Sequence, residues 1–146
     1  MELDQLRIFI YAQLADHGAA PTSDAIASHF GTTPDDAREA LVALGKSRAV
    51  ILHPASREIW MAAPFSAVST RFRVHGARAS WWANCAWDMF GIPAFLSESV
   101  RIDAMCADCN EHVEIDVDAR DGPRSSDGLV HILLPARRWY DDIGFT

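Results

Sequence analysis

The stretch WWANCAWD, residues 81–88, places a thiol and a carboxylate three residues apart, Cys85 and Asp88. If this segment is helical, positions i and i+3 lie on one face, so the two side chains can meet. The dipole at the start of a helix favours a thiolate, and the carboxylate can accept the thiol proton. The pair would then be a soft metal ligand beside a proton carrier. A dry, apolar pocket around it is expected from three aromatic side chains, Trp81, Trp82 and Trp87.

A structural interpretation of the same stretch competes with the chemical one. A cysteine on an aromatic helix is usually a small core residue, and Asp88 could be an ordinary surface carboxylate. Spacing alone favours this interpretation.

The other two cysteines, Cys106 and Cys109, form a single C-x-x-C on an expected turn. His112 follows three residues later as a candidate third metal ligand. A structural zinc site needs four ligands, and no fourth is evident from the sequence. A redox role lacks the βαβ context that usually accompanies it. The alternative is a turn with incidental thiols.

The remaining candidates indicate structure rather than chemistry. His53, His75 and His131 lie in or beside expected strands, and no nucleophile is paired with them by sequence. The Arg137–Arg138 pair could bind an anion, but a solvated surface is the simpler interpretation. The sequence contains no glycine-rich phosphate loop, nucleophile elbow or H-E-x-x-H motif.

Composition predicts a soluble cytoplasmic protein of one domain or two small ones. Of the 146 residues, 49% are hydrophobic and 23% are charged, and no apolar run reaches the roughly 18 residues of a membrane span. The first residues are acidic, which argues against a secretory signal. Three cysteines cannot form a complete disulfide framework. The net charge of −7 argues against nucleic-acid binding by bulk electrostatics.

Residues 1–63 are expected to form a degenerate winged helix-turn-helix domain. Three helical patterns with Gly, Thr and Pro end signals precede a hairpin in AVILHPASREIWMA. The presumed recognition helix begins with Asp35 and Asp36 and carries Glu39 against a single basic residue, Arg38. Such a helix would repel phosphates, so a winged helix that does not bind DNA is favoured.

Residues 70–146 are expected to form a second α/β domain, which makes the whole chain α+β. Alternation predicts a mixed or antiparallel sheet with strands in TRFRVHG, SVRIDAMC, HVEIDVDA and a buried LVHILLP. The stretch ARASWWANCAWDMFG is predicted to be a helix carrying Cys85 and Asp88, capped by Ser80 and ended by Gly91 and Pro93. A last helix or turn is expected in ARRWYDDIGFT.

The segments WWANCAWDMFGIPAFL, VRIDAMCADCNEHVEIDV and VHILLPARRWYDDIGFT, after a degenerate winged helix, resemble the alkylmercury (organomercurial) lyases. The resemblance implies protonolysis of a carbon–mercury bond without a required cofactor. Cys85 would be the first mercury-binding thiolate, and Asp88 would take its proton and pass it to the leaving carbon. The products would be a hydrocarbon and Hg²⁺, which would pass to an external thiol carrier or a mercuric reductase-like acceptor.

The sequence departs from this family at its C-terminal end. The second catalytic cysteine of the family lies after DDIGFT, and the given sequence ends at Thr146. Three explanations stay open: a truncated chain, a homologue that binds mercury without cleaving it, or a second thiolate from Cys109 or from Cys106, which matches a family cysteine regarded as structural. An exposed apolar surface is also expected, either covered by a partner chain in a homodimer or accompanied by lower stability. A thiol-based metal sensor or carrier and a winged-helix regulator are the alternative functions.

Overall fold

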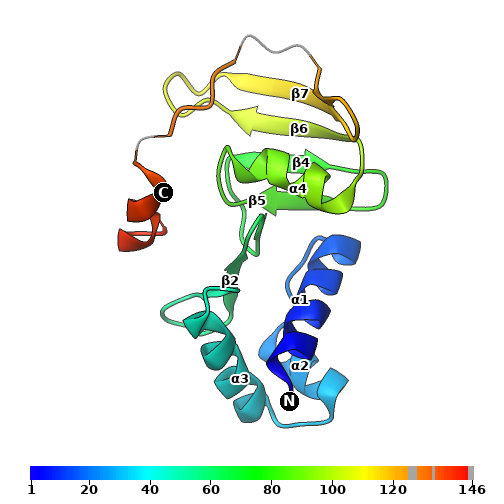
Figure 1. The fold of residues 1–146 in the computed structure, drawn as a ribbon, viewed down its shortest axis with the longest axis vertical. Coiled ribbons are helices and arrows are strands. Elements are labelled where there is room, and N and C mark those ends of the chain that lie inside the picture. Colours follow the sequence, from blue (N-terminus) through cyan, green and yellow to red (C-terminus); the bar gives the residue numbers. More distant parts are fainter. Residues whose placement is uncertain (125–127, 133, 145–146) are drawn as a thin grey trace.

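The computed structural model describes residues 1–124, 128–132 and 134–144, and is α+β with one antiparallel sheet (Figure 1). The strand order is β1-β2-β3-β5-β4-β6-β7-β8. The helices are α1 (Leu3–His17), α2 (Ser23–Phe30), α3 (Pro34–Lys46), α4 (Asp88–Leu96) and the 3₁₀ helix η1 (Ala136–Asp141). The strands are β1 (Ile51–Leu52), β2 (Ile59–Ala62), β3 (Phe65–Ser66), β4 (Phe72–His75), β5 (Ser80–Ala83), β6 (Val100–Met105), β7 (His112–Asp118) and β8 (Gly122–Pro123).

Capping side chains begin α2 and α3, and glycines in the left-handed conformation, Gly18 and Gly31, follow the ends of α1 and α2. The Thr22 side chain accepts a hydrogen bond from the backbone of Ala25 and caps α2. Thr33 and Asp36 form a reciprocal capping box at the start of α3. The hairpin β1–β2 follows α3, which gives the predicted order of three helices and a hairpin. Assignment of this unit as a winged helix stays a prediction.

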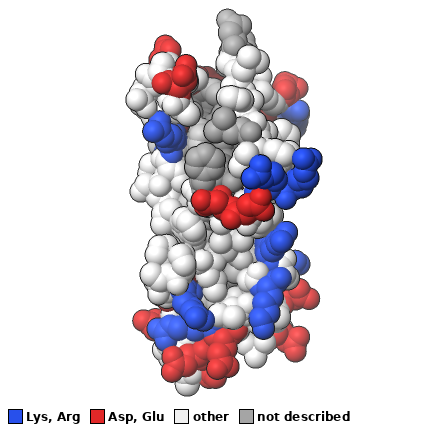
Figure 2. Space-filling view, turned by 90° about the vertical axis from the view of Figure 1, so that its left-hand side faces the viewer, with Lys and Arg blue, Asp and Glu red and all other residues white. Residues whose placement is uncertain are grey.

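The charge distribution on α3 follows the expectation for a helix that does not bind DNA. Arg38 Nη1 lies 2.8 Å from Asp35 Oδ1, so the helix's one arginine faces a carboxylate of its own first turn. Figure 2 shows basic and acidic side chains mixed over one face of the molecule, with acidic ones gathered at the lower end.

One sheet connects the two halves of the chain. β2 pairs with β3, β3 pairs with β5, and the ladder continues through β4 to β6 and β7. In Figure 1, α4 lies across β4 and β5 while α1 approaches from below. The domains expected at 1–63 and 70–146 therefore share a sheet, and their separation stays a prediction. None of the helices in the described ranges is both long and apolar enough to cross a membrane.

Trp81 fastens α1 to the sheet. Its side chain is 1% exposed, and its indole N–H donates a 2.7 Å hydrogen bond to the Leu14 carbonyl near the end of α1. Gly18, which ends α1 with φ of +69°, lies so close to β5 that a Cβ there would be 2.2 Å from the Ser80 carbonyl oxygen. Glycine is therefore required both by the left-handed backbone and by the close approach.

The predicted helix over the WWANCAWD stretch is wrong in its first half. Ser80–Ala83 is strand β5, and α4 begins only at Asp88 and continues through Gly91 and Pro93, the two predicted stop signals. Trp81 faces the core and Trp82 the opposite side, which is the period of a strand. Pairing with β3 and β4 on both sides overrides the local helical pattern.

The predicted buried strand in LVHILLP is also wrong for the residues that the structure describes. Residues 129–132 are exposed and form no strand, and Leu129 is 97% exposed. Leu133, in the middle of this stretch, lies outside the described residues. An apolar run becomes a strand only when it pairs with a neighbouring strand, and the described residues of this run pair with none.

We expect Trp81→Phe to lower the free energy of unfolding by about 1–3 kcal/mol, because it removes a buried hydrogen bond and leaves unfilled volume. Trp82→Phe is the matched control. The half-buried Trp82 stacks under Arg73 at 4.4 Å and should lose about 1 kcal/mol or less. Urea unfolding followed by circular dichroism measures both, and equal losses would contradict the anchoring role of Trp81.

Candidate functional site

Cys85 lies in the turn between β5 and α4. Ala83 is the last residue of β5, and the backbone N–H of Met89 donates to the Cys85 carbonyl at 3.1 Å, which closes the first turn of α4. Cys85 therefore precedes the helix that was expected to contain it. Its sulfur still receives hydrogen bonds from the backbone N–H groups of Trp87 and Asp88, at the positive end of α4.

The thiol and the carboxylate meet, as the spacing predicts, although by a different backbone path. Cys85 Sγ lies 3.7 Å from Asp88 Oδ2, within donating distance for a thiol. The side-chain amide of Asn84 donates to the same oxygen at 3.1 Å. Both members of the pair are half-buried.

Burial determines where the proton of this pair resides. Burial raises the pKa of Asp88 above its ordinary value, and hydrogen bonds from Asn84 and Cys85 oppose that shift only in part. Burial also raises the pKa of the Cys85 thiol; the backbone N–H of Asp88 opposes the shift, and the Asp88 charge adds to it. The thiol therefore keeps its proton at neutral pH beside a carboxyl group with increased proton affinity.

The pair faces a cavity of about 560 Å³ that is predominantly apolar. Its described lining comes from the ends of β2, β3 and β4, the β5–α4 turn, and the C-terminal segment. Of the three tryptophans expected around the pair, Trp87, which is 63% exposed, lines this cavity. Trp81 and Trp82 are not among its lining residues; they serve the core and the opposite side of the sheet.

Sequence reasoning missed most of the cavity wall. Trp60 enters from β2 and Trp139 from η1, and His131, which was interpreted as structural, also lines the cavity. These residues come from elements far apart in the chain, so no local spacing could have grouped them. Trp60 packs closely against the C-terminal segment, because a Cβ at Gly144 would lie only 2.8 Å from its ring.

Two polar residues of the cavity lining, Thr70 and Asn84, lie beside the turn between β5 and α4. Thr70 donates a 2.6 Å hydrogen bond to the Ala83 carbonyl and so fixes the end of β5 against the start of β4. The Asn84 side-chain oxygen is buried and has no hydrogen-bond partner among the described residues. A buried acceptor of this kind costs free energy unless a ligand or water donates to it.

Among the described residues, Cys106 and Cys109 do not belong to a group of three potential metal ligands. Three potential metal ligands lie close together, within the described ranges, only at Asp103, His112 and Glu114. His112 therefore belongs to that group on the sheet rather than to a set with Cys106 and Cys109. Zinc bound by the two thiols alone stays a prediction.

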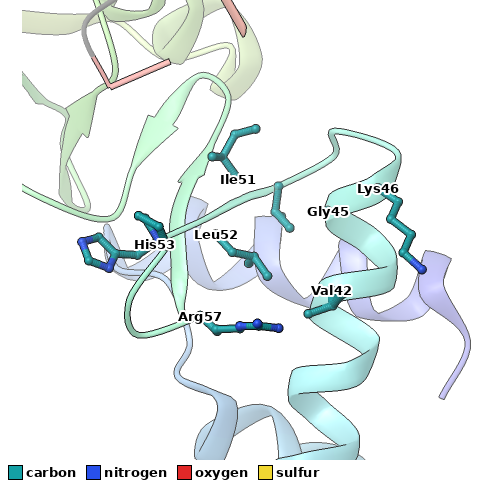
Figure 3. A pocket seen from close by; sticks show the side chains of 9 residues that line it. Val42, Gly45, Lys46, Ile51, Leu52, His53 and Arg57 are labelled. Carbon is teal, nitrogen blue, oxygen red and sulfur yellow. The ribbon is translucent and has the colours of Figure 1, made fainter. Parts of the chain in front are cut away.

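A second hollow, of about 470 Å³, lies between α3 and the β1–β2 hairpin (Figure 3). Its described lining is apolar except for a few basic side chains, including Lys46, His53 and Arg57. It offers no thiol or carboxylate, so the chemistry is placed at the first cavity.

The chain resembles known proteins in family and in fold. The alkylmercury lyase family matches residues 65–145, more than half of the chain. The crystal structure of the mercury-bound form of MerB2 has the same fold, with a TM-score of 0.64 and 20% sequence identity. The match covers 85% of this chain and 59% of that one, so the chain spans well under two thirds of MerB2. No curated protein matches the sequence.

The Cys85–Asp88 contact predicts a shift in thiol titration. We expect Asp88→Asn to lower the pKa of Cys85, because the substitution removes a neighbouring negative charge that opposes the thiolate. The rate of Cys85 alkylation by iodoacetamide against pH measures it in a Cys106→Ser/Cys109→Ser background. In Asp88→Asn the pKa of Cys85 should still exceed that of a free cysteine, because burial of the thiol is the main cause of its raised pKa. Asp116→Asn, at an exposed position on β7, is the control; an unchanged or raised pKa in Asp88→Asn would contradict the contact.

Proposed function

Because the chain belongs to the alkylmercury lyase family, we propose that it cleaves carbon–mercury bonds by protonolysis, with Cys85 as the mercury-binding thiolate and Asp88 as the proton donor. The observation that supports this most directly is the 3.7 Å contact between the Cys85 sulfur and an Asp88 oxygen on the wall of an apolar cavity. Mercury is a soft metal and prefers sulfur, so the thiol is the natural first ligand.

The reaction proceeds in two balanced steps. In the first, the Cys85 thiol proton moves to the Asp88 carboxylate, a sulfur–mercury bond forms, and the anion bound to the organomercurial leaves. In the second, a further thiolate binds mercury and Asp88 gives its proton to the carbon. The electron pair of the carbon–mercury bond goes to the new carbon–hydrogen bond. The hydrocarbon leaves, and Hg²⁺ stays on Cys85 and the second sulfur.

The electrostatics of the pair suit both steps. A carboxyl group whose pKa is raised by burial holds the transferred proton until the carbon is in reach. The Asn84 amide bonds Asp88 Oδ2 and orients the carboxyl group toward the sulfur. The backbone N–H groups that reach the Cys85 sulfur stabilise it when it is negatively charged.

The cavity suits an organic group on mercury. Trp60, Trp87 and Trp139 place aromatic surface beside the thiol, and aromatic side chains bind apolar groups by burial and stacking. The preferred substrate class is therefore an aryl or alkyl mercurial, with a small-molecule thiol such as glutathione or a protein thiol as acceptor.

A second candidate is a thiol-based mercury-binding protein without turnover. The observation in its favour is that Cys85 is the only cysteine in the described lining of the cavity. One thiolate beside a carboxyl group can bind a mercurial, whereas cleavage needs a further thiolate to weaken the carbon–mercury bond.

Incubation of the protein with phenylmercuric acetate and excess glutathione should release benzene. Cys85→Ser should lose activity, and Asp88→Asn should still bind the mercurial but release benzene at least about 100-fold more slowly, the usual size of a general acid contribution. Gas chromatography of the headspace measures benzene, and mass spectrometry measures the bound mercurial. Binding without benzene from the unmodified protein would favour the second candidate, and equal benzene from Cys85→Ser would exclude both roles of Cys85.

Trp87→Ala should raise the KM for phenylmercury about tenfold, because one aromatic contact is worth roughly 1–1.5 kcal/mol. The stability of the protein should change little, since Trp87 is 63% exposed. Phe95→Ala is the matched control: this half-exposed aromatic lies on α4, which Trp87 directly precedes, but is not in the described cavity lining. Steady-state kinetics compare the two variants, and an equal rise in KM would contradict a substrate contact at Trp87.

A further inference from the structure

The two remaining thiols lie together on the turn between β6 and β7. The turn is closed by hydrogen bonds from the Cys106 N–H to the Glu111 carbonyl at 2.9 Å and from the Asn110 N–H to the Cys106 carbonyl at 3.0 Å. Both cysteines are free; Cys106 is partly exposed and Cys109 fully so. The turn therefore presents two sulfurs to solvent from a closed backbone loop.

Hydrogen bonds within this turn favour the thiolate form of one sulfur. The N–H groups of Cys109 and Asp108 and the Cys109 thiol hydrogen-bond to the Cys106 sulfur, and together they hold the pKa of Cys106 below its usual value. The Cys109 sulfur lies 4.0 Å from a Glu111 carboxylate oxygen, which can accept its proton. Two thiolates from a C-x-x-C can bind one soft metal ion at a time.

The turn adjoins the cavity that contains Cys85. Ala107, between the two cysteines, is part of the cavity wall, as is Arg71. The Arg71 carbonyl accepts from the Met105 N–H at 3.1 Å, and its guanidinium donates to the Asn110 side chain at 2.9 Å. These two contacts hold the turn against the cavity.

We propose that Cys106 and Cys109 form a mercuric-ion acceptor site within the chain, which takes Hg²⁺ from Cys85 after the carbon–mercury bond is cleaved. The inference deepens the proposed function and rests on it for the source of the ion. The pair is a carrier of product rather than a part of the cleavage step.

The transfer is a thiolate exchange without oxidation or reduction. The Cys106 thiolate attacks the mercury held by Cys85 and an external thiolate, and Cys109 follows as it loses its proton. Two new sulfur–mercury bonds form on the turn and the two earlier ones break. Cys85 takes up the proton that Cys109 loses, and the external thiolate leaves, so charge and atoms balance.

Mercury suits this pair better than zinc does. Zinc in structural sites takes four ligands, and within the described ranges the nearest imidazole on this hairpin, His112, groups with Asp103 and Glu114 instead. Two sulfurs without further ligands favour a soft ion of low coordination number.

The test uses HgCl₂ alone and the full chain, with a phosphine reductant that keeps the thiols reduced. Cys85→Ser should bind one Hg²⁺ per chain through two sulfurs, as measured by competition with glutathione and by X-ray absorption at the mercury edge. The triple variant Cys85→Ser/Cys106→Ser/Cys109→Ser should bind Hg²⁺ roughly 100-fold or more weakly. Loss of a single residue that only hydrogen-bonds to a metal ligand already lowers metal affinity about 10–100-fold, and here both ligands are lost. Circular dichroism checks that each variant folds. We expect that it does, because the two substituted cysteines of the turn are not buried.

A second arm separates this inference from the lyase proposal. After one turnover of phenylmercuric acetate, the unmodified protein should retain its mercury against glutathione longer than Cys106→Ser/Cys109→Ser, while both release benzene when glutathione is in excess. Cys85→Ser that binds no Hg²⁺, or equal mercury retention by the double variant, would overturn the acceptor site. Absence of benzene alone would overturn the lyase proposal. The HgCl₂ measurement would still show whether Cys106 and Cys109 bind Hg²⁺.

Discussion

The buried indole of Trp81 is the contact on which the arrangement of this chain depends. It fills the core between α1 and the sheet, and its N–H bonds the Leu14 carbonyl across 67 positions of sequence. With Trp81 facing inward, β5 must end at Ala83, where it meets β3 and β4. The chain then reverses through Cys85 into α4. The position of the Cys85 thiol thus depends on how a neighbouring tryptophan is buried.

The turn after β5 gives the thiol an environment that a position inside a helix would not provide. Before the first turn of α4, the Cys85 sulfur receives backbone N–H groups and reaches Asp88 on the same side. Partial burial raises the proton affinity of both groups, so the pair retains a proton that it can transfer. The proposed proton transfer and mercury binding would therefore share one point of the cavity wall.

The cavity is a product of long-range packing. Trp60 on β2 meets the C-terminal segment at Gly144, and the guanidinium of Arg48 lies 4.2 Å from the Tyr140 ring and holds η1 near the end of α3. Elements from both halves of the chain therefore enclose the space beside Cys85. The helical N-terminal half, whose acidic α3 is ill-suited to DNA, supports and partly encloses the site.

The sequence by itself determined the elements with strong end signals and the pairing of Cys85 with Asp88. Thr22, Thr33 and their capping partners act within a few residues, so α2 and α3 were predictable, and a separation of three residues brings thiol to carboxylate in either backbone path. Only the tertiary structure decided that the tryptophan stretch is a strand and that LVHILLP is not one in its described part. It also decided that Trp60 and Trp139, rather than Trp81 and Trp82, line the cavity. Strand pairing and cavity walls depend on which distant segments become neighbours, and local patterns carry no record of that.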